Sequence, residues 1–245
     1  MPFAGGVALL AGPSIAGVLL TGLVDGRSGL RRLVSGLRRW RVGARWYAVA
    51  LLTGPFVMGA TVFALSLASP EFRPDFLTAD NKLSIVVTGI VLGLIVGFFE
   101  ELGWTGFGLP RLRRRYGVVT TRLVMGLLWS AWHFPVFAGT TDPTGILPAA
   151  LVVAVLLFAW LPPYRVLMVW VYDRTESLLI AMLMHVPISV TTFVLASEAT
   201  TSAALVVPVL ISGAAFWVIV AVVAWANGGS LTRRQDAAAQ EGVPI

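Results

Sequence analysis

Four ionisable side chains lie in otherwise apolar stretches of this sequence, and together they could activate a water molecule. Glu100 and Glu101 follow the uncharged run LSIVVTGIVLGLIVGFF (83–99), and the only two histidines of the chain, His133 and His185, also lie in apolar segments. A charge at membrane depth costs roughly 3 kcal/mol on insertion scales, so such residues tend to face a bundle interior and pair with one another. The four side chains therefore predict one polar pocket between three helices.

The residue types favour hydrolysis of an amide by activated water. A glutamate and a histidine that share a water can act as a general base. His185 and Ser189 are four residues apart and share a helix face, so they could donate hydrogen bonds to a developing oxyanion. A serine nucleophile is disfavoured because no serine accompanies a histidine and an orienting carboxylate in the sequence. Zinc is conceivable from the ligand types, but the HExxH spacing is absent, and neither a metal nor a cofactor is expected.

Helix geometry divides the roles within this set. Glu100 and Glu101 point about 100° apart, so one is expected to face the pocket and the other a neighbouring helix or the interface. Trp129 lies one turn before His133 and can form a wall of the site.

A proline follows each histidine by two residues, as Pro135 and Pro187. Each proline removes one intrahelical hydrogen bond, so both helices are predicted to bend near their histidines.

The composition indicates a membrane protein. Hydrophobic residues make up 57% of the 245 residues and charged residues 12%, whereas a soluble domain has about 25% charged residues. We predict an all-α, polytopic helix bundle in the cell membrane. It would form one domain over 1–227, with the chemistry concentrated in 83–197 and a solvated tail at 228–245. The absence of cysteine excludes disulfides and thiolate metal sites.

Spanning helices need about 20 mostly apolar residues, and seven segments qualify. They are 5–24, 46–69, 83–102, 120–139, 147–171, 177–197 and 203–226. The first is interpreted as a retained helix rather than a signal peptide, because it has no charged leading region and no clear cleavage site. The fifth is interrupted by Pro162 and Pro163, so it is either one broken helix or two shorter pieces.

The basic residues predict an orientation and a lipid partner. Fifteen arginines follow the odd-numbered spans or lie in the tail, whereas Arg73 and Lys82 lie on the opposite side and Arg165 fits neither side. The positive-inside rule then places the N-terminus outside and the C-terminus in the cytoplasm. The arginine-rich segment 26–45 also has apolar residues at helical spacing, so it is predicted to lie on the inner leaflet and contact anionic lipid. Nucleic acid is not expected as a partner.

Three motifs in order resemble a known family. EELGWTGFGLPRL (100–112), WSAWH (129–133) and YDRTESLLIAMLMHVPIS (172–189) are similar to the successive motifs of the CPBP family. This family comprises the CAAX-protease and bacteriocin-processing membrane proteins, also called the Abi family. The resemblance extends, less specifically, over 12–190.

The resemblance implies an intramembrane endopeptidase that acts on a peptide or protein substrate without a metal. On that template Glu100 and His133 activate the water, and Glu101 supports them. His185 and Ser189 form the oxyanion hole. Supporting roles fall to three further residues, Trp104, Thr105 and Trp129.

Two positions depart from the family pattern. The first motif usually reads EExxxR, and its arginine position here is Thr105; the third usually ends HxxxN, and that position here is Ser189. Thr105 brings no positive charge, so Glu101 is expected to be either protonated or paired with an arginine from 111–115.

These departures leave an alternative of another class open, a non-catalytic immunity or regulatory protein on the same scaffold. A proton-coupled transporter is less favoured, because the two halves of the chain show no matching hydropathy repeat.

Overall fold

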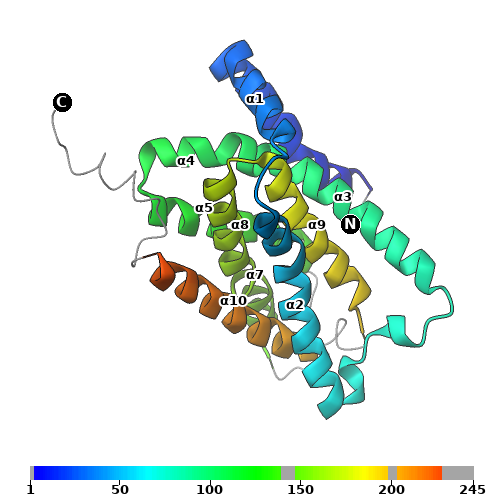
Figure 1. Cartoon of the computed structure of the whole chain (residues 1–245). Coiled ribbons are helices and arrows are strands. Elements are labelled where there is room, and N and C mark those ends of the chain that lie inside the picture. The colour runs from blue at the N-terminus through cyan, green and yellow to red at the C-terminus, as the bar shows by residue number, and fades with distance from the viewer. Residues whose placement is uncertain (1–2, 139–146, 198–202, 228–245) are drawn as a thin grey trace.

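The computed structural model describes residues 3–138, 147–197 and 203–227, and within these ranges the chain forms helices and no strand. The predicted solvated tail, 228–245, lies outside the described residues. The helices are α1 (Phe3–Arg38), α2 (Ala44–Ala68), α3 (Lys82–Gly103), α4 (Leu109–Arg115), α5 (Val118–Trp132), α6 (Phe134–Phe137), α7 (Ala149–Phe158), α8 (Leu161–Thr175), α9 (Leu178–Val194) and α10 (Val206–Ala226). A π-helical turn, Trp104–Gly108, joins α3 to α4. Figure 1 shows the helices gathered into one bundle, in which α3 packs along α9 and α5 along α8.

The helices match the seven predicted spans. Five helical segments are long and apolar enough to cross a membrane: Leu9–Arg38, Ala44–Ala68, Lys82–Arg115, Ala149–Thr175 and Val206–Ala226. Two shorter apolar helices, α5 and α9, correspond to the fourth and sixth predicted spans. The protein is therefore a multi-pass helical membrane protein, as predicted. The sidedness of its termini stays a prediction.

The arginine-rich connections meet at one end of the bundle. Ion pairs join them there: Arg39 with Glu176, Arg111 with Asp25, and Arg113 with Asp173. At the other end, the turn after α2 meets the end of α9, where the Asp75 N–H donates to the Ala196 carbonyl at 2.9 Å. The bundle thus separates the two groups of connections that the positive-inside argument assigned to opposite sides.

The predicted amphipathic segment is the second half of α1. It begins at a kink at Gly26, whose φ of 60° and ψ of −150° are accessible to glycine at little cost. Leu33 is buried and packs with Leu102, Leu178 and Met182, so part of the apolar face contacts protein rather than lipid. Binding of anionic lipid to this segment stays a prediction.

Glycines set the close approach of α3 and α9. A Cβ at Gly93 would lie 2.9 Å from the Val186 carbonyl oxygen, and one at Gly97 would lie 2.9 Å from Val186 Cγ2. Small residues at this spacing let membrane helices pack backbone to backbone. Glu101 continues the same four-residue spacing, so the stripe that packs on α9 carries this carboxylate towards α9.

The fifth predicted span is two helices, α7 and α8. Pro162 and Pro163 lie in the first turn of α8, where a missing N–H removes no helical hydrogen bond. Gly126 lets α5 approach this turn, since a Cβ there would lie 3.0 Å from the Pro162 carbonyl oxygen. The chain break therefore places the start of α8 against α5, inside the bundle.

The two histidines differ in their backbone setting. The fourth span was predicted to bend at His133, but the helix ends there instead. Helix α5 stops at Trp132, and α6 begins at Phe134 with Pro135 in its first turn. Pro135 has no N–H to continue the helix, so the chain restarts rather than bends. In contrast, α9 continues through Pro187 to Val194.

Candidate functional site

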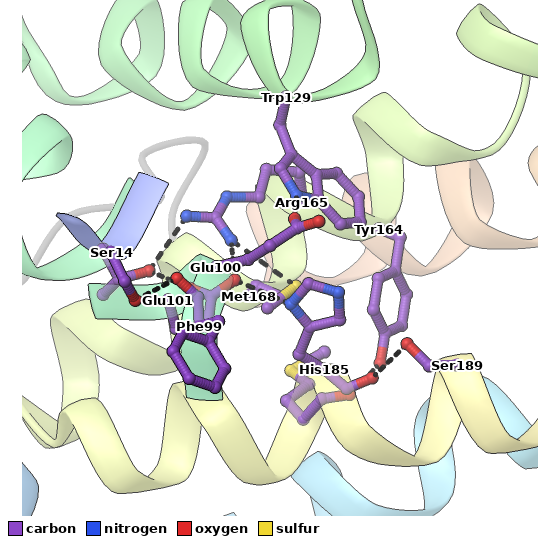
Figure 2. A network of polar contacts seen from close by, with 12 residues as sticks. Ser14, Phe99, Glu100, Glu101, Trp129, Tyr164, Arg165, Met168, His185 and Ser189 are labelled. Atoms are coloured by element: carbon purple, nitrogen blue, oxygen red, sulfur yellow. Dashed lines mark hydrogen bonds and ion pairs between the residues drawn. The ribbon is translucent and has the colours of Figure 1, made fainter. Parts of the chain in front are cut away.

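Glu101 is the centre of a sealed group of side chains contributed by α3, the π-helical turn, α8 and α9. Its Oε1 accepts a hydrogen bond from Arg165 Nη1 at 2.6 Å and lies 2.9 Å from His185 Nδ1. The Thr105 hydroxyl donates to its other oxygen, and Arg165 Nη2 donates to Thr105 Oγ at 2.9 Å. None of the four is more than 2% exposed. We call Glu101, Thr105, Arg165 and His185 the inner cluster (Figure 2).

The predicted pairing of Glu101 with an arginine from 111–115 is wrong. No arginine of 111–115 reaches Glu101 among the described residues, because Arg111 is paired with Asp25 and Arg113 with Asp173. Arg165 on α8 supplies the positive charge that Thr105 lacks, so a protonated Glu101 is not needed for charge balance.

The sequence did contain a signal for this partner. Arg165 is the only charged residue between Asp142 and Asp173, and an isolated ionisable residue inside a span is by default a candidate for a functional site.

Glu100 belongs to a second group, which reaches the surface. Its Oε2 accepts a hydrogen bond from the Trp129 indole at 2.9 Å, and it is 3% exposed. His133 is half-buried, and its Nδ1 lies 2.8 Å from the Trp129 carbonyl oxygen. That carbonyl can only accept, so Nδ1 carries a proton and Nε2 is the free ring nitrogen. We call Glu100, Trp129 and His133 the outer cluster.

Trp129 joins the two clusters. Its ring meets His133 edge to face at a centroid distance of 4.9 Å and His185 at 5.3 Å. The Arg165 guanidinium carbon lies 5.5 Å from the centroid of the same ring. Since Trp129 is 1% exposed, it separates the sealed inner cluster from the more open outer one while fixing their relative position. Trp129 bonds to Glu100 and packs on both imidazole rings, and His185 faces Glu101, so the structure brings both glutamates and both histidines into one region.

Comparison with known proteins covers this same part of the chain. The family model for type II CAAX prenyl endopeptidases, Rce1-like, matches residues 82–191, from α3 to α9. This core is similar to the CAAX-protease family. A curated relative, CAAX prenyl protease 2 of Methanococcus maripaludis, is 25% identical over 140 residues. The match covers 56% of this chain and 49% of the relative, so the chain spans about half the length of that relative.

The third motif of the CAAX-protease family is placed on α9, but its last position is occupied differently. Ser189 is half-buried, and its hydroxyl donates to the His185 carbonyl at 3.3 Å. Local back-bonding of this kind uses the donor that an oxyanion hole would need. The role of Ser189 as an oxyanion donor stays a prediction.

Tyr164, next to Arg165, was not singled out from the sequence. Its hydroxyl donates to the Met184 carbonyl at 2.6 Å, one residue before His185. This bond ties the start of α8 to the turn of α9 that carries the histidine. A tyrosine in an apolar run gives no signal by itself, so sequence reasoning had little means to find it.

Trp104, the remaining member of the predicted set, lies at the edge of the site. Trp104 meets Trp132 edge to face at 6.0 Å and begins the π-helical turn, one residue before Thr105 of the inner cluster. In the part of the chain that the structure describes, no three His, Asp or Glu side chains are grouped so as to hold a metal ion.

Proposed function

We propose that this protein is an intramembrane endopeptidase that uses a glutamate- and histidine-activated water. One observation carries the proposal: Glu100 bonds to the Trp129 indole and the half-buried His133 packs on the same ring, next to the sealed Glu101–His185 pair. A carboxylate and an imidazole nitrogen placed around one ring in this way are suited to share a water and remove its proton. The family match supports the same class of reaction.

The reaction consists of two proton transfers and one bond exchange. The Glu100 carboxylate takes one proton from the water as its oxygen attacks the scissile carbonyl carbon, while the Nε2 of His133 accepts a hydrogen bond from the other O–H and holds the water in place. The electron pair of the carbonyl moves onto its oxygen, which becomes an oxyanion. When the tetrahedral intermediate collapses, the C–N bond breaks and the amine nitrogen receives the proton. The products are a new carboxyl terminus and a new amino terminus.

His185 is the candidate for stabilising the oxyanion. Its Nδ1 faces Glu101 at 2.9 Å, so only Nε2 is directed away from the inner cluster. To donate from Nε2 while Nδ1–H faces the Glu101 carboxylate, the ring must carry a proton on each nitrogen. Ser189 is the proposed second donor, for which its hydroxyl must turn away from the His185 carbonyl.

The test is cleavage by purified protein in lipid bilayers, with a library of membrane-anchored peptides as substrates. Wild type should cleave at least one member. Glu100→Gln and His133→Ala should each lower kcat by about 10²–10⁴-fold, the range typical of a lost general base, without loss of folding. Glu71→Gln, an exposed glutamate at the other end of the bundle, is the matched control and should retain full activity. Wild-type turnover in either site variant would contradict the assignment.

Addition of EDTA separates this reaction from metal-dependent hydrolysis. We expect the wild type to remain active, because no step above requires a metal. Loss of activity on chelation, with recovery on adding a divalent metal, would overturn the metal-free proposal.

A second candidate is a non-catalytic immunity or regulatory protein built on the same scaffold. The observation that favours it is the state of Ser189, whose hydroxyl is engaged with its own helix. Absence of cleavage across the whole library, together with unchanged behaviour of Glu100→Gln in a cell-based assay, would favour this candidate over the protease.

A further inference from the structure

We propose that Arg165 on α8 is a positioning residue for His185 and that it takes over, from a second helix, the place of the arginine usual in the first family motif. The effect of Arg165 on turnover rests on the proposed protease function. Its effect on the orientation of the His185 ring does not, so the two effects can be measured separately.

The first argument is position. Thr105 stands where the family pattern has arginine, four residues after Glu101, and its hydroxyl bonds to that carboxylate. The Arg165 guanidinium reaches the same place from the opposite side, with Nη1 on Glu101 at 2.6 Å and Nη2 on Thr105 at 2.9 Å. An arginine at 105 would direct its guanidinium into this space. The small Thr105 side chain leaves the space to Arg165.

The second argument is that stability alone does not account for Arg165. Its side chain is fully buried, so its charge has lost all contact with water. Replacing a buried ion pair by apolar residues of similar volume is often neutral or stabilising, because the desolvation cost offsets the attraction. A guanidinium sealed inside a helix bundle therefore calls for a role that an apolar pair could not fill.

The third argument is what the guanidinium fixes. Glu101 Oε1 faces both Arg165 Nη1 and His185 Nδ1, so the planar fork of Arg165 sets the direction from which the carboxylate meets the imidazole. That direction determines the rotation of the His185 ring, and hence where Nε2 points. Arg165 is fully buried behind Trp129 and cannot touch a substrate. It acts through Glu101 and His185.

The two histidines make the test direct, because the chain contains no others. Protein labelled with ¹⁵N-histidine and reconstituted in bilayers should give imidazole signals from His185 and His133 alone, assigned with His133→Gln. In Arg165→Met the ¹⁵N shifts of His185 should change, whereas those of His133, held by a backbone carbonyl, should change much less. Arg165→Lys, which keeps the charge but cannot bridge Glu101 and Thr105, should give a smaller change in the same direction.

Moving the arginine back to α3 is the decisive variant. In Thr105→Arg/Arg165→Met the guanidinium returns to the motif position, and the His185 shifts should return towards wild type. In the cleavage assay Arg165→Met should lose about 10–100-fold in kcat, as when a partner that orients a reacting histidine is removed, with KM little changed. The double variant should recover at least half of that loss on a logarithmic scale.

Arg122→Met provides the matched control. Arg122 is also buried, on α5, and its Nε lies 3.1 Å from Asp173. Its loss should leave the His185 shifts unchanged, and adding Thr105→Arg should not compensate for it. Compensation there would mean that Thr105→Arg stabilises the bundle in general.

The outcomes are distinct. Unchanged His185 shifts in folded Arg165→Met or Arg165→Lys, or a double variant no closer to wild type than Arg165→Met, would overturn the positioning role. Absence of cleavage by the wild type itself would overturn the protease proposal, but the NMR result would still decide the role of Arg165.

Discussion

Glu100 and Glu101 are adjacent in the sequence and both buried, yet they have different partners. Glu101 is surrounded by an arginine, a histidine and a threonine, all sealed from water. Glu100 accepts one indole hydrogen bond and lies beside a half-exposed histidine. A step of about 100° along one helix is therefore enough to give two identical carboxylates different partners, as the proposed division between a positioning and a reacting glutamate requires.

The largest effect expected from this contrast is on stability. Glu101→Leu leaves the buried Arg165 charge without its partner, so it should lower the free energy of unfolding by about 3–5 kcal/mol. Glu100→Leu removes one hydrogen bond to a charged group and should cost about 1–3 kcal/mol. Reversible unfolding in bilayer discs would measure both. Equal losses would show that the two carboxylates are not held differently.

A double replacement sharpens the same point. Glu101→Leu/Arg165→Leu removes the whole ion pair, so it should recover most of the stability lost in Glu101→Leu. It should not recover cleavage, because His185 then lacks its orienting carboxylate. Recovery of both stability and turnover would mean that the inner cluster only packs.

Trp129→Phe tests the element that separates the clusters. Phenylalanine keeps much of the ring but not the indole N–H, so Glu100 should lose its donor at a cost of about 1.5–3 kcal/mol in unfolding free energy. Cleavage should fall, whereas the ¹⁵N shifts of His185 should change little. A larger change at His185 than in the outer cluster would show that Trp129 chiefly supports the inner side.

Gly97→Ala tests whether the α3–α9 contact sets both clusters at once. The added methyl group would lie 2.9 Å from Val186 Cγ2, and overpacking of this kind typically costs about 1–3 kcal/mol. Gly59→Ala is the control, because a Cβ there meets nothing within 4 Å. We expect Gly97→Ala to reduce kcat and Gly59→Ala to leave it unchanged. Full activity in Gly97→Ala would show that the two helices can separate slightly without moving the site.

The smallest effect is expected at Ser189. Because its hydroxyl is engaged with the His185 carbonyl, Ser189→Ala should lower kcat by less than the roughly 10²–10³-fold seen when a full oxyanion donor is lost. Ser189→Asn presents an amide with longer reach and should keep or raise activity. The test is to measure kcat for cleavage by wild type, Ser189→Ala and Ser189→Asn at equal folded concentration. If alanine equals serine and asparagine is worse, position 189 has no part in the oxyanion hole.

Residue types alone were sufficient to predict that the glutamates and histidines converge, because isolated charges in apolar helices have few other places to lie. The glycine spacing from Gly89 to Gly97 also indicates which glutamate faces α9. The motif pattern could not predict that Arg165 pairs with Glu101. This contact joins helices 64 residues apart in the chain, and the motif directs attention to the threonine instead.

The helix ends were predicted less well than the spans. The apolar run around His133 suggested a continuous helix, since hydropathy does not distinguish a bent helix from one that stops and restarts. The helix stops and restarts at His133 because Pro135 has no N–H to continue it and because His133 packs on Trp129.

The π-helical turn Trp104–Gly108 has a consequence for how this chain tolerates insertions and deletions. A π turn holds one residue more than an α-helical turn, so it shifts the angular phase of everything that follows by about 100°. Upstream of it, the stripe ending at Glu101 faces α9; downstream, Arg111 and Arg113 face Asp25 and Asp173. Deleting one residue in this turn would remove the extra residue, and a regular helix could then keep both halves on their partners; a regular helix that kept every residue would rotate the downstream half away from its partners. The turn therefore lets the candidate catalytic residues before it and the arginines after it each face their own partners.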